Sequence, residues 1–169
     1  MRVYMIAVMS VDGFIARSSQ ERINWSSPED RQFFADQSQR AGVVVMGANT
    51  IRAIGHALPG RRTIVYSRRD FDMEGVETTQ EEPKVLLARL EREGHTEVAI
   101  GGGSQIFTMF LQAGVMNEIY LSVDPSLFGG GARLLGELPP TRLELLETSM
   151  LGQQTVLLHY RVLPAGPNH

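Results

Sequence analysis

The sequence of 169 residues contains no cysteine. Disulfide bonds, cysteine nucleophiles and thiolate metal ligands are therefore excluded. The apolar N-terminal stretch MRVYMIAVMSVDGFIA is too short to cross a bilayer, is interrupted by Asp12 and Gly13, and lacks a small-residue cleavage site. The four histidines show no spacing typical of metal ligands. These absences favour a cytoplasmic protein with no membrane partner and no bound metal.

Positive charge is not in excess either. The formal net charge of -3 at pH 7 offers no general attraction for a nucleic-acid backbone, so we expect no nucleic-acid partner. With 43% hydrophobic and 21% charged residues, a chain of this length can bury a sizeable core. We expect one domain over residues 1–163, followed by a flexible tail at 164–169.

Strand-like and helix-like segments alternate along the chain, which is typical of an α/β fold. The patterns predict strands at 2–10, 42–47, 61–67 and 96–100, and helices at 27–41, 49–55, 82–93 and 104–114. The last third of the chain has few helical signals and predicts strands at 117–128, 143–151 and 154–163. We therefore expect a central mixed sheet, mostly parallel but antiparallel at its C-terminal strands, flanked by helices.

Three consecutive glycines, Gly101, Gly102 and Gly103, separate the predicted strand 96–100 from the helix that follows. In an open α/β sheet, ligands bind beyond the carboxyl ends of the strands, and a glycine-rich turn entering a helix lets backbone amides approach a phosphate. The turn lacks the Rossmann fingerprint, because Ile106 stands at the last glycine position, and it lacks a P-loop lysine. A dinucleotide site is one interpretation, and a simple tight turn is the other.

A second strand-to-helix corner resembles the first one. The stretch VVVMGANTI ends a strand at Gly47 and offers Asn49 and Thr50 as helix-capping residues. Two helix N-termini at one sheet edge could hold the two ends of a long anionic cofactor. Arg68 and Arg69 follow a predicted strand and could meet an additional phosphate, which favours NADP over NAD. The alternatives are an ordinary capped helix and a solvated pair of arginines.

The motifs MIAVMSVDGFIA, NWSSPEDRQFF, VVMGANTIRAIGHALPGRRTIVYSR, VAIGGGSQIFTMFL and EIYLSVDPSLFGGGARLL occur in this order along the chain. In them the chain resembles the dihydrofolate reductase superfamily, including the reductase domain at the C-terminal end of the riboflavin-biosynthesis protein RibD. The resemblance implies a dihydrofolate reductase-like fold, an NADPH-dependent reductase, and a mobile loop at 16–24 that closes over the nicotinamide. The residues implied for the NADPH site are Val8, Gly47, Asn49, Thr50, Ser67, Arg68, Ile100, Gly101, Gly102, Gly103, Ser104, Gln105 and Ile106.

Some residues match the substrate site of dihydrofolate reductases. The resemblance implies that Trp25 is the active-site tryptophan, that Asp30 is the catalytic carboxylate, and that Phe34 is an apolar substrate contact. It also implies that Arg61 binds a carboxylate of the substrate and that the hydroxyl group of Ser122 supports the catalytic acid. If these residues decide the substrate, we expect it to be dihydrofolate.

Other segments, above all SVDGFIA and LFGGGARLL, match the riboflavin branch. There Arg31 would lie near the phosphate of a ribosyl-phosphate substrate. Ala48 replaces the arginine that dihydrofolate reductases commonly use for the 2′-phosphate, which leaves Arg68 or Arg69 for that group. The favoured substrate is 5-amino-6-(5-phosphoribosylamino)uracil; dihydrofolate reduction and a non-catalytic NADPH-binding sensor are the alternatives. The riboflavin branch also implies a homodimer through the C-terminal strands.

Asp30 is the residue of the candidate site with the most direct chemical role. Reduction of a C=N bond by hydride transfer requires a proton, which the protein or its water must supply. A carboxyl group partly buried beside Trp25 and Phe34 would have a raised pKa and could hold that proton near neutral pH. The alternative interpretation is that Glu29 and Asp30 only complement the positive end of a helix.

Overall fold

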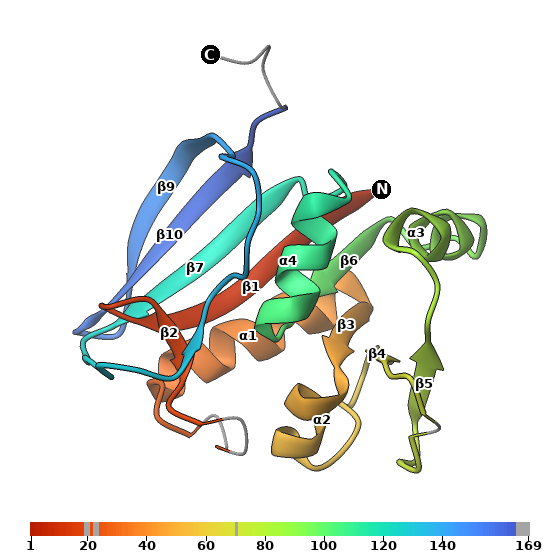
Figure 1. Ribbon diagram of the computed structural model, residues 1–169, viewed down its shortest axis with the longest axis horizontal. Helices are drawn as coiled ribbons and strands as arrows, with labels where there is room; N and C mark the ends of the chain where they lie inside the picture. Colours follow the sequence, from red (N-terminus) through yellow and green to blue (C-terminus); the bar gives the residue numbers. More distant parts are fainter. Residues whose placement is uncertain (19–20, 22–23, 70, 165–169) are drawn as a thin grey trace.

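A computed structural model describes residues 1–18, 21, 24–69 and 71–164 of the chain. Its main feature is an eight-stranded sheet that runs through the molecule (Figure 1). In spatial order, the strands are β5 (Val76–Thr79), β4 (Arg62–Tyr66), β3 (Val43–Gly47), β6 (Glu97–Ile100), β1 (Arg2–Ser10), β7 (Glu118–Asp124), β10 (Thr155–Val162) and β9 (Leu143–Leu151). The helices are α1 (Pro28–Ala41), α2 (Ala48–Ile54), α3 (Pro83–Arg92) and α4 (Ser104–Gln112).

The sheet is mixed, as the sequence predicts. In the spatial order, each pair of neighbouring strands between β5 and β7 is parallel, whereas β10 is antiparallel to both β7 and β9. Every predicted helix and strand is present, with ends that move by a few residues at most elements. Three short strands were not predicted: β5 and a small separate sheet formed by β2 (Phe14–Ala16) and β8 (Ala132–Arg133).

The core has two layers, one on each face of the sheet. Helices α1 and α2 pack on a cluster that includes Tyr4, Val44 and Met46, and helices α3 and α4 pack on the opposite cluster, which includes Val45 and Phe110. Strand β3 is apolar along its length because it is buried on both faces, which is typical of parallel strands. The prediction of a central sheet flanked by helices is therefore confirmed.

Helix α1 begins and ends where its sequence directs. The Ser27 hydroxyl accepts a hydrogen bond from the backbone N–H of Asp30 at 3.1 Å, and Pro28 occupies the first helical position. The helix ends at Gly42, which has a left-handed φ of 72°. This start places Asp30 in the first turn, on the side of the helix that faces the sheet, where it is buried.

Two expectations fall partly on residues that are not described. The expected mobile loop at 16–24 includes residues 19, 20, 22 and 23, which lie outside the described part of the chain, and so does the expected tail at 164–169 apart from Pro164. Within the described residues, no helix combines the length and the apolar character needed to cross a membrane.

Candidate active site

A cleft of about 1220 Å³ opens at the carboxyl ends of β1, β3, β4, β5 and β6. Its walls come from α1 on one side and from the beginnings of α2 and α4 on the other. Most residues of the predicted site line it: Val8, Asp30, Arg31, Phe34, Gly47, Asn49, Thr50, Arg61, Ser67, Arg68, Gly101, Gly102, Gly103, Ser104, Gln105 and Ile106. Three do not, because Ile100 and Ser122 lie buried in the sheet and Trp25 packs elsewhere.

The two glycine corners are bonded to each other. The backbone N–H of Gly47 donates to the carbonyl oxygen of Gly102 at 2.7 Å, and that of Gly101 donates to Val45 at 2.9 Å. A Cβ atom on Gly101 would lie 2.9 Å from the terminal methyl carbon of Met46. The ring of Phe34 would lie 3.2 Å from the same Cβ atom, so packing against the protein's own side chains favours a small residue at position 101.

Gly102 is constrained in a second way. Its φ is +101°, a conformation that favours glycine, and a Cβ atom there would lie 2.9 Å from the ring of Phe107. The tight-turn interpretation therefore explains Gly101 and Gly102 without a ligand. It does not explain why the two corners open into the same cleft.

The helix N-termini of α2 and α4 supply the anion-binding potential of the cleft. These helices start from Gly47 and Gly103, and neither start is capped by a side-chain hydrogen bond. First-turn amides that have no partner within a helix carry partial positive charge and favour an anion. The neighbouring side chains Thr50 and Ser104 add hydroxyl groups to the same wall.

Arginines lie at the far end of the cleft, beyond β4 and β5. Arg68 and Arg69 are exposed, and the Ser67 hydroxyl donates to the carbonyl oxygen of Arg69 at 2.7 Å, which braces the turn. These residues also line a smaller pocket of about 230 Å³ together with Thr79 and Gln80. The cleft therefore ends in two guanidinium groups that could meet a phosphate.

Asp30 provides a carboxyl group on the opposite side of the cleft, and only 6% of the residue is exposed. Burial raises its pKa, and the negative charge of Asp124 acts in the same direction, while the hydroxyl groups of Ser122 and Ser26 oppose this rise in the pKa. The Ser26 hydroxyl oxygen is buried and makes no well-formed hydrogen bond within the described residues. Asp30 is thus set to keep its proton to a higher pH than an exposed aspartate.

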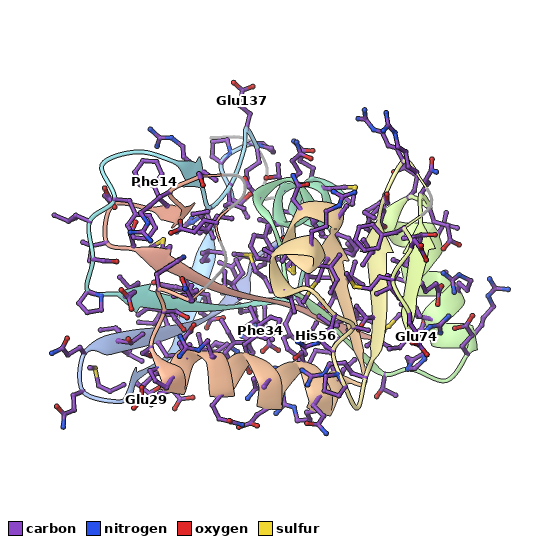
Figure 2. The ribbon with its side chains drawn as sticks, turned by 90° about the horizontal axis from the view of Figure 1, so that it is seen from below. Phe14, Glu29, Phe34, His56, Glu74 and Glu137 are labelled. Atoms are coloured by element: carbon purple, nitrogen blue, oxygen red, sulfur yellow. The ribbon has the colours of Figure 1, made fainter. Side chains whose placement is uncertain are left out.

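The aromatic residues of the predicted site separate into two places. Phe34 projects from the inner side of α1 toward the centre of the molecule and lines the cleft, whereas Glu29 lies at the outer start of the helix (Figure 2). Trp25 instead packs edge-to-face on Phe128, with ring centroids 4.9 Å apart. Its indole N–H is buried and has no hydrogen-bond partner among the described residues. Phe34 therefore forms part of the cleft wall, whereas Trp25 packs on Phe128 and does not line the cleft.

Both predicted substrate-binding arginines are tied to the backbone of the protein. Arg61 donates from Nη1 to the carbonyl oxygen of Ala35 at 2.9 Å and from Nε to that of Pro59 at 3.0 Å, and burial lowers its pKa. Arg31 is exposed and donates to the carbonyl oxygen of Ser26. Both side chains line the cleft, but part of the hydrogen-bonding capacity of each is already used.

Sequence reasoning missed one wall of the cleft. Ile15 and Ala16 in β2 and Ala132 in β8 line it. Strands of three and two residues are too short to show an alternating pattern, and their pairing joins positions more than a hundred residues apart. No local signal could have identified this wall; only the glycines that follow Phe128 marked the segment as unusual.

The sequence of the chain matches a known family. The family model described as RibD C-terminal domain matches residues 2–157. The chain is 31% identical over 131 residues to a type 3 dihydrofolate reductase of Salmonella typhimurium, covering 76% of each chain.

Two solved structures share the fold. A pyrimidine reductase-like protein from Corynebacterium diphtheriae superposes with a TM-score of 0.79 at 18% identity, covering 97% of this chain and 92% of that one. Dihydrofolate reductase from Enterococcus faecalis, solved in complex with NADP(H) and RAB-propyl, gives a TM-score of 0.74 at 22% identity, covering 95% of this chain and 96% of that one. From the matched family model and the related sequence, the chain belongs to the RibD C-terminal domain family of the dihydrofolate reductase superfamily.

Proposed function

We propose that this protein is an NADPH-dependent reductase of a small heterocyclic or ribosyl-phosphate substrate. The observation that carries the proposal is one cleft that joins two uncapped helix N-termini to a buried carboxyl group, Asp30. The names of the relatives support it, since they include dihydrofolate reductases, one of them solved with NADP(H), and a pyrimidine reductase-like protein.

The residues that line the cleft fit NADPH, a dinucleotide that carries an additional phosphate. The amides at the starts of α2 and α4 can bind its pyrophosphate, and Arg68 or Arg69 can bind the additional phosphate that distinguishes NADPH from NADH. NADPH, when bound, supplies a hydride. The protein has to bind the cofactor in one orientation, exclude water from the reacting groups and provide a proton.

Asp30 is the group that can provide the proton. Hydride addition to a carbon leaves negative charge on the oxygen or nitrogen bonded to it, and a neutral carboxyl group can neutralise that charge directly or through one water. The raised pKa of Asp30 keeps part of the population protonated where an exposed aspartate would be ionised. Phe34 and Met46, beside it in the cleft, make the surroundings apolar.

For the substrate, we favour 5-amino-6-(5-phosphoribosylamino)uracil, reduced at its ribosyl carbon. Arg31 supports this choice, because it is exposed on the α1 side of the cleft, where it can meet a substrate phosphate. Dihydrofolate is the second candidate, and it is supported by Phe34 and Asp30 on one face of α1 and by the 31% identical relative. Arg61, already held by Ala35 and Pro59, has less free capacity for a folate carboxylate.

The direct experiment measures oxidation of NADPH at 340 nm by the purified protein with each substrate in turn. We expect turnover with the ribosylaminouracil phosphate and slower or no turnover with dihydrofolate. Turnover with dihydrofolate alone would overturn the substrate assignment. Tight NADPH binding with reduction of neither compound would favour the non-catalytic sensor over the enzyme.

A further inference from the structure

Asp12 lies outside the cleft, yet its carboxylate connects two segments that build the cleft wall. Its Oδ1 accepts hydrogen bonds from the Ser10 hydroxyl at 2.6 Å and from the backbone N–H of Phe128 at 3.1 Å, and its Oδ2 accepts one from Gly129 at 2.7 Å. Asp12 is in the turn between β1 and β2, and its last two partners are 116 and 117 positions further along the chain. One carboxylate thus joins the β1–β2 turn to the segment between β7 and β8.

Other contacts show that this joint is closely fitted. The backbone N–H of Val11 donates to Ser126 at 2.8 Å, and that of Leu134 donates to Gly13 at 3.1 Å. A Cβ atom on Gly131 would overlap the carbonyl oxygen of Ala16, so glycine alone allows this approach. The segment between β7 and β8 therefore lies directly against β2, and β8 pairs with β2 (Figure 1).

The joint extends toward the acid side of the cleft through aromatic rings. Phe128, whose amide is held by Asp12, packs edge-to-face on Trp25 at 4.9 Å, with the ring planes at 78°. Trp25 directly precedes Ser26, one of the hydroxyl residues that act on Asp30. Contacts therefore connect Asp12 through Phe128 to Trp25, whose neighbour in the chain, Ser26, acts on Asp30.

The carboxylate of Asp12 stays ionised in mild acid as well as at neutral pH. The Ser10 hydroxyl and the amides of Phe128 and Gly129 lower the pKa of Asp12 to about 2. The carboxylate of Asp12 accepts three hydrogen bonds and uses both oxygens for them. A side-chain amide of the same shape has only one oxygen, so it cannot accept all three in this arrangement.

We propose that Asp12 is a positioning residue for the candidate active site: it holds residues 125–131 so that Phe128 fixes Trp25 and β8 supports the cleft wall at Ile15 and Ala16. Only the effect on turnover rests on the proposed reductase function. The structural effect on Trp25 and on the two amides is independent of any substrate.

The test is the substitution Asp12→Asn. The side-chain oxygen of asparagine can still accept from Ser10 and Phe128, but its NH₂ group then faces the N–H of Gly129, and two donors cannot pair. Trp25 is the single tryptophan of the chain, so its near-ultraviolet circular dichroism reports on this site alone. We expect that band to weaken and hydrogen exchange at the amides of Phe128 and Gly129 to accelerate, by about tenfold or more.

Glu93→Gln is the matched control. The pKa of Glu93 is likewise lowered by hydrogen bonds, but its partners are Arg62 and Arg89, close to the end of α3. This variant should keep the wild-type Trp25 band and amide exchange. If Asp12→Asn does not fold, Phe128→Leu removes the ring contact with Trp25 and keeps the carboxylate; it should weaken the Trp25 band while Gly129 stays protected.

With a substrate that the wild type reduces, Asp12→Asn should lower kcat by about tenfold, since small displacements at a reacting site slow turnover strongly, and it should leave the KM for NADPH almost unchanged. An unaltered Trp25 band and unaltered exchange in folded Asp12→Asn would overturn the proposal. A wild type that reduces neither substrate would count against the reductase function, and the Trp25 and exchange measurements would still decide the role of Asp12.

Discussion

The two sides of the cleft are built from different parts of the chain. The proposed cofactor side consists of backbone, namely the glycine corners and the starts of α2 and α4, and a Cβ atom on Gly101 or Gly102 would lie 2.9 Å from Met46 or Phe107. The acid side depends on one side chain, Asp30, whose properties come from burial. We therefore expect single substitutions on the backbone side to lower stability, because they disturb packing. On the acid side we expect them to lower kcat, because they remove the proton donor.

The largest expected effect is on the acid side. Asp30→Asn keeps the shape of the side chain and removes its acidic proton, so kcat should fall by about 10²–10⁴-fold while NADPH affinity is retained. Glu29→Gln is the control, since Glu29 is the neighbouring acid in the same helical turn but is exposed. Steady-state kinetics and NADPH fluorescence titration measure the two quantities. Full turnover by Asp30→Asn would show that the acid side contributes no proton.

The backbone side should respond in stability rather than in chemistry. Gly102→Ala introduces a Cβ atom 2.9 Å from Phe107 at a φ of +101°, and we expect it to lower the free energy of unfolding by about 2–4 kcal/mol and to weaken NADPH binding. Gly130→Ala is the matched control in the other triple glycine, because a Cβ atom there meets nothing within 4 Å. Urea unfolding compares them; equal stability of the two variants would contradict the packing argument.

The pH dependence separates the two sides further. Because burial raises the pKa of Asp30 in the folded state, the folded protein binds this proton more tightly than the unfolded chain does. The contribution of Asp30 to stability is thus fully present below its unfolded pKa and is lost as the pH rises through the folded pKa. Asp30→Asn should be more stable than the wild type at pH 7, and this difference should disappear in acid. Urea unfolding as a function of pH measures it, and a difference independent of pH would contradict the assignment.

A smaller effect is expected at the arginine end of the cofactor side. Arg68→Ala should weaken binding of NADPH by about tenfold and leave binding of NADH unchanged, because only NADPH carries the additional phosphate. Arg92→Ala removes an exposed arginine from α3, outside the cleft, and should change neither affinity. Equal losses for both cofactors in Arg68→Ala would place the 2′-phosphate elsewhere.

The smallest effect on turnover is expected at β9, which neither side of the cleft uses. This edge strand of nine residues exposes Leu145 at 54% and Met150 at 53%, and a long edge strand with exposed apolar side chains is suited to pair with a second copy of the chain. Leu145→Glu should convert the expected homodimer to a monomer without changing turnover. Sedimentation velocity measures the first effect, and a wild-type monomer would remove the homodimer proposal.

Local sequence signals predicted most of the fold. The bounds of β1 and β9 agree with the predicted 2–10 and 143–151, because long alternating or apolar runs between turn residues are strong signals. Strand β5, with the sequence VETT, was missed because it is short and polar, and its neighbour β4 supplies the pairing. Strands β2 and β8 were missed because three and two residues are too few to show an alternating pattern.

The composition of the cleft wall was predictable in part. The two glycine corners identified the carboxyl ends of β3 and β6, and most of the predicted residues do line one cleft. Trp25 is one of the three exceptions: its ring packs on Phe128, which is about a hundred positions away, and local patterns say nothing about such a contact.

By itself, the sequence determined the alternation of helices and strands, the start of α1 at Ser27 and Pro28, and the helices that begin after Gly47 and Gly103, because each of these depends on a few adjacent residues. Only the tertiary structure decided that Asp30 is buried and that its pKa is raised. It also decided that the glycines pack against the protein's own side chains. Burial and close contact are set by segments that are distant in the chain, and they exist only once the whole sheet has assembled.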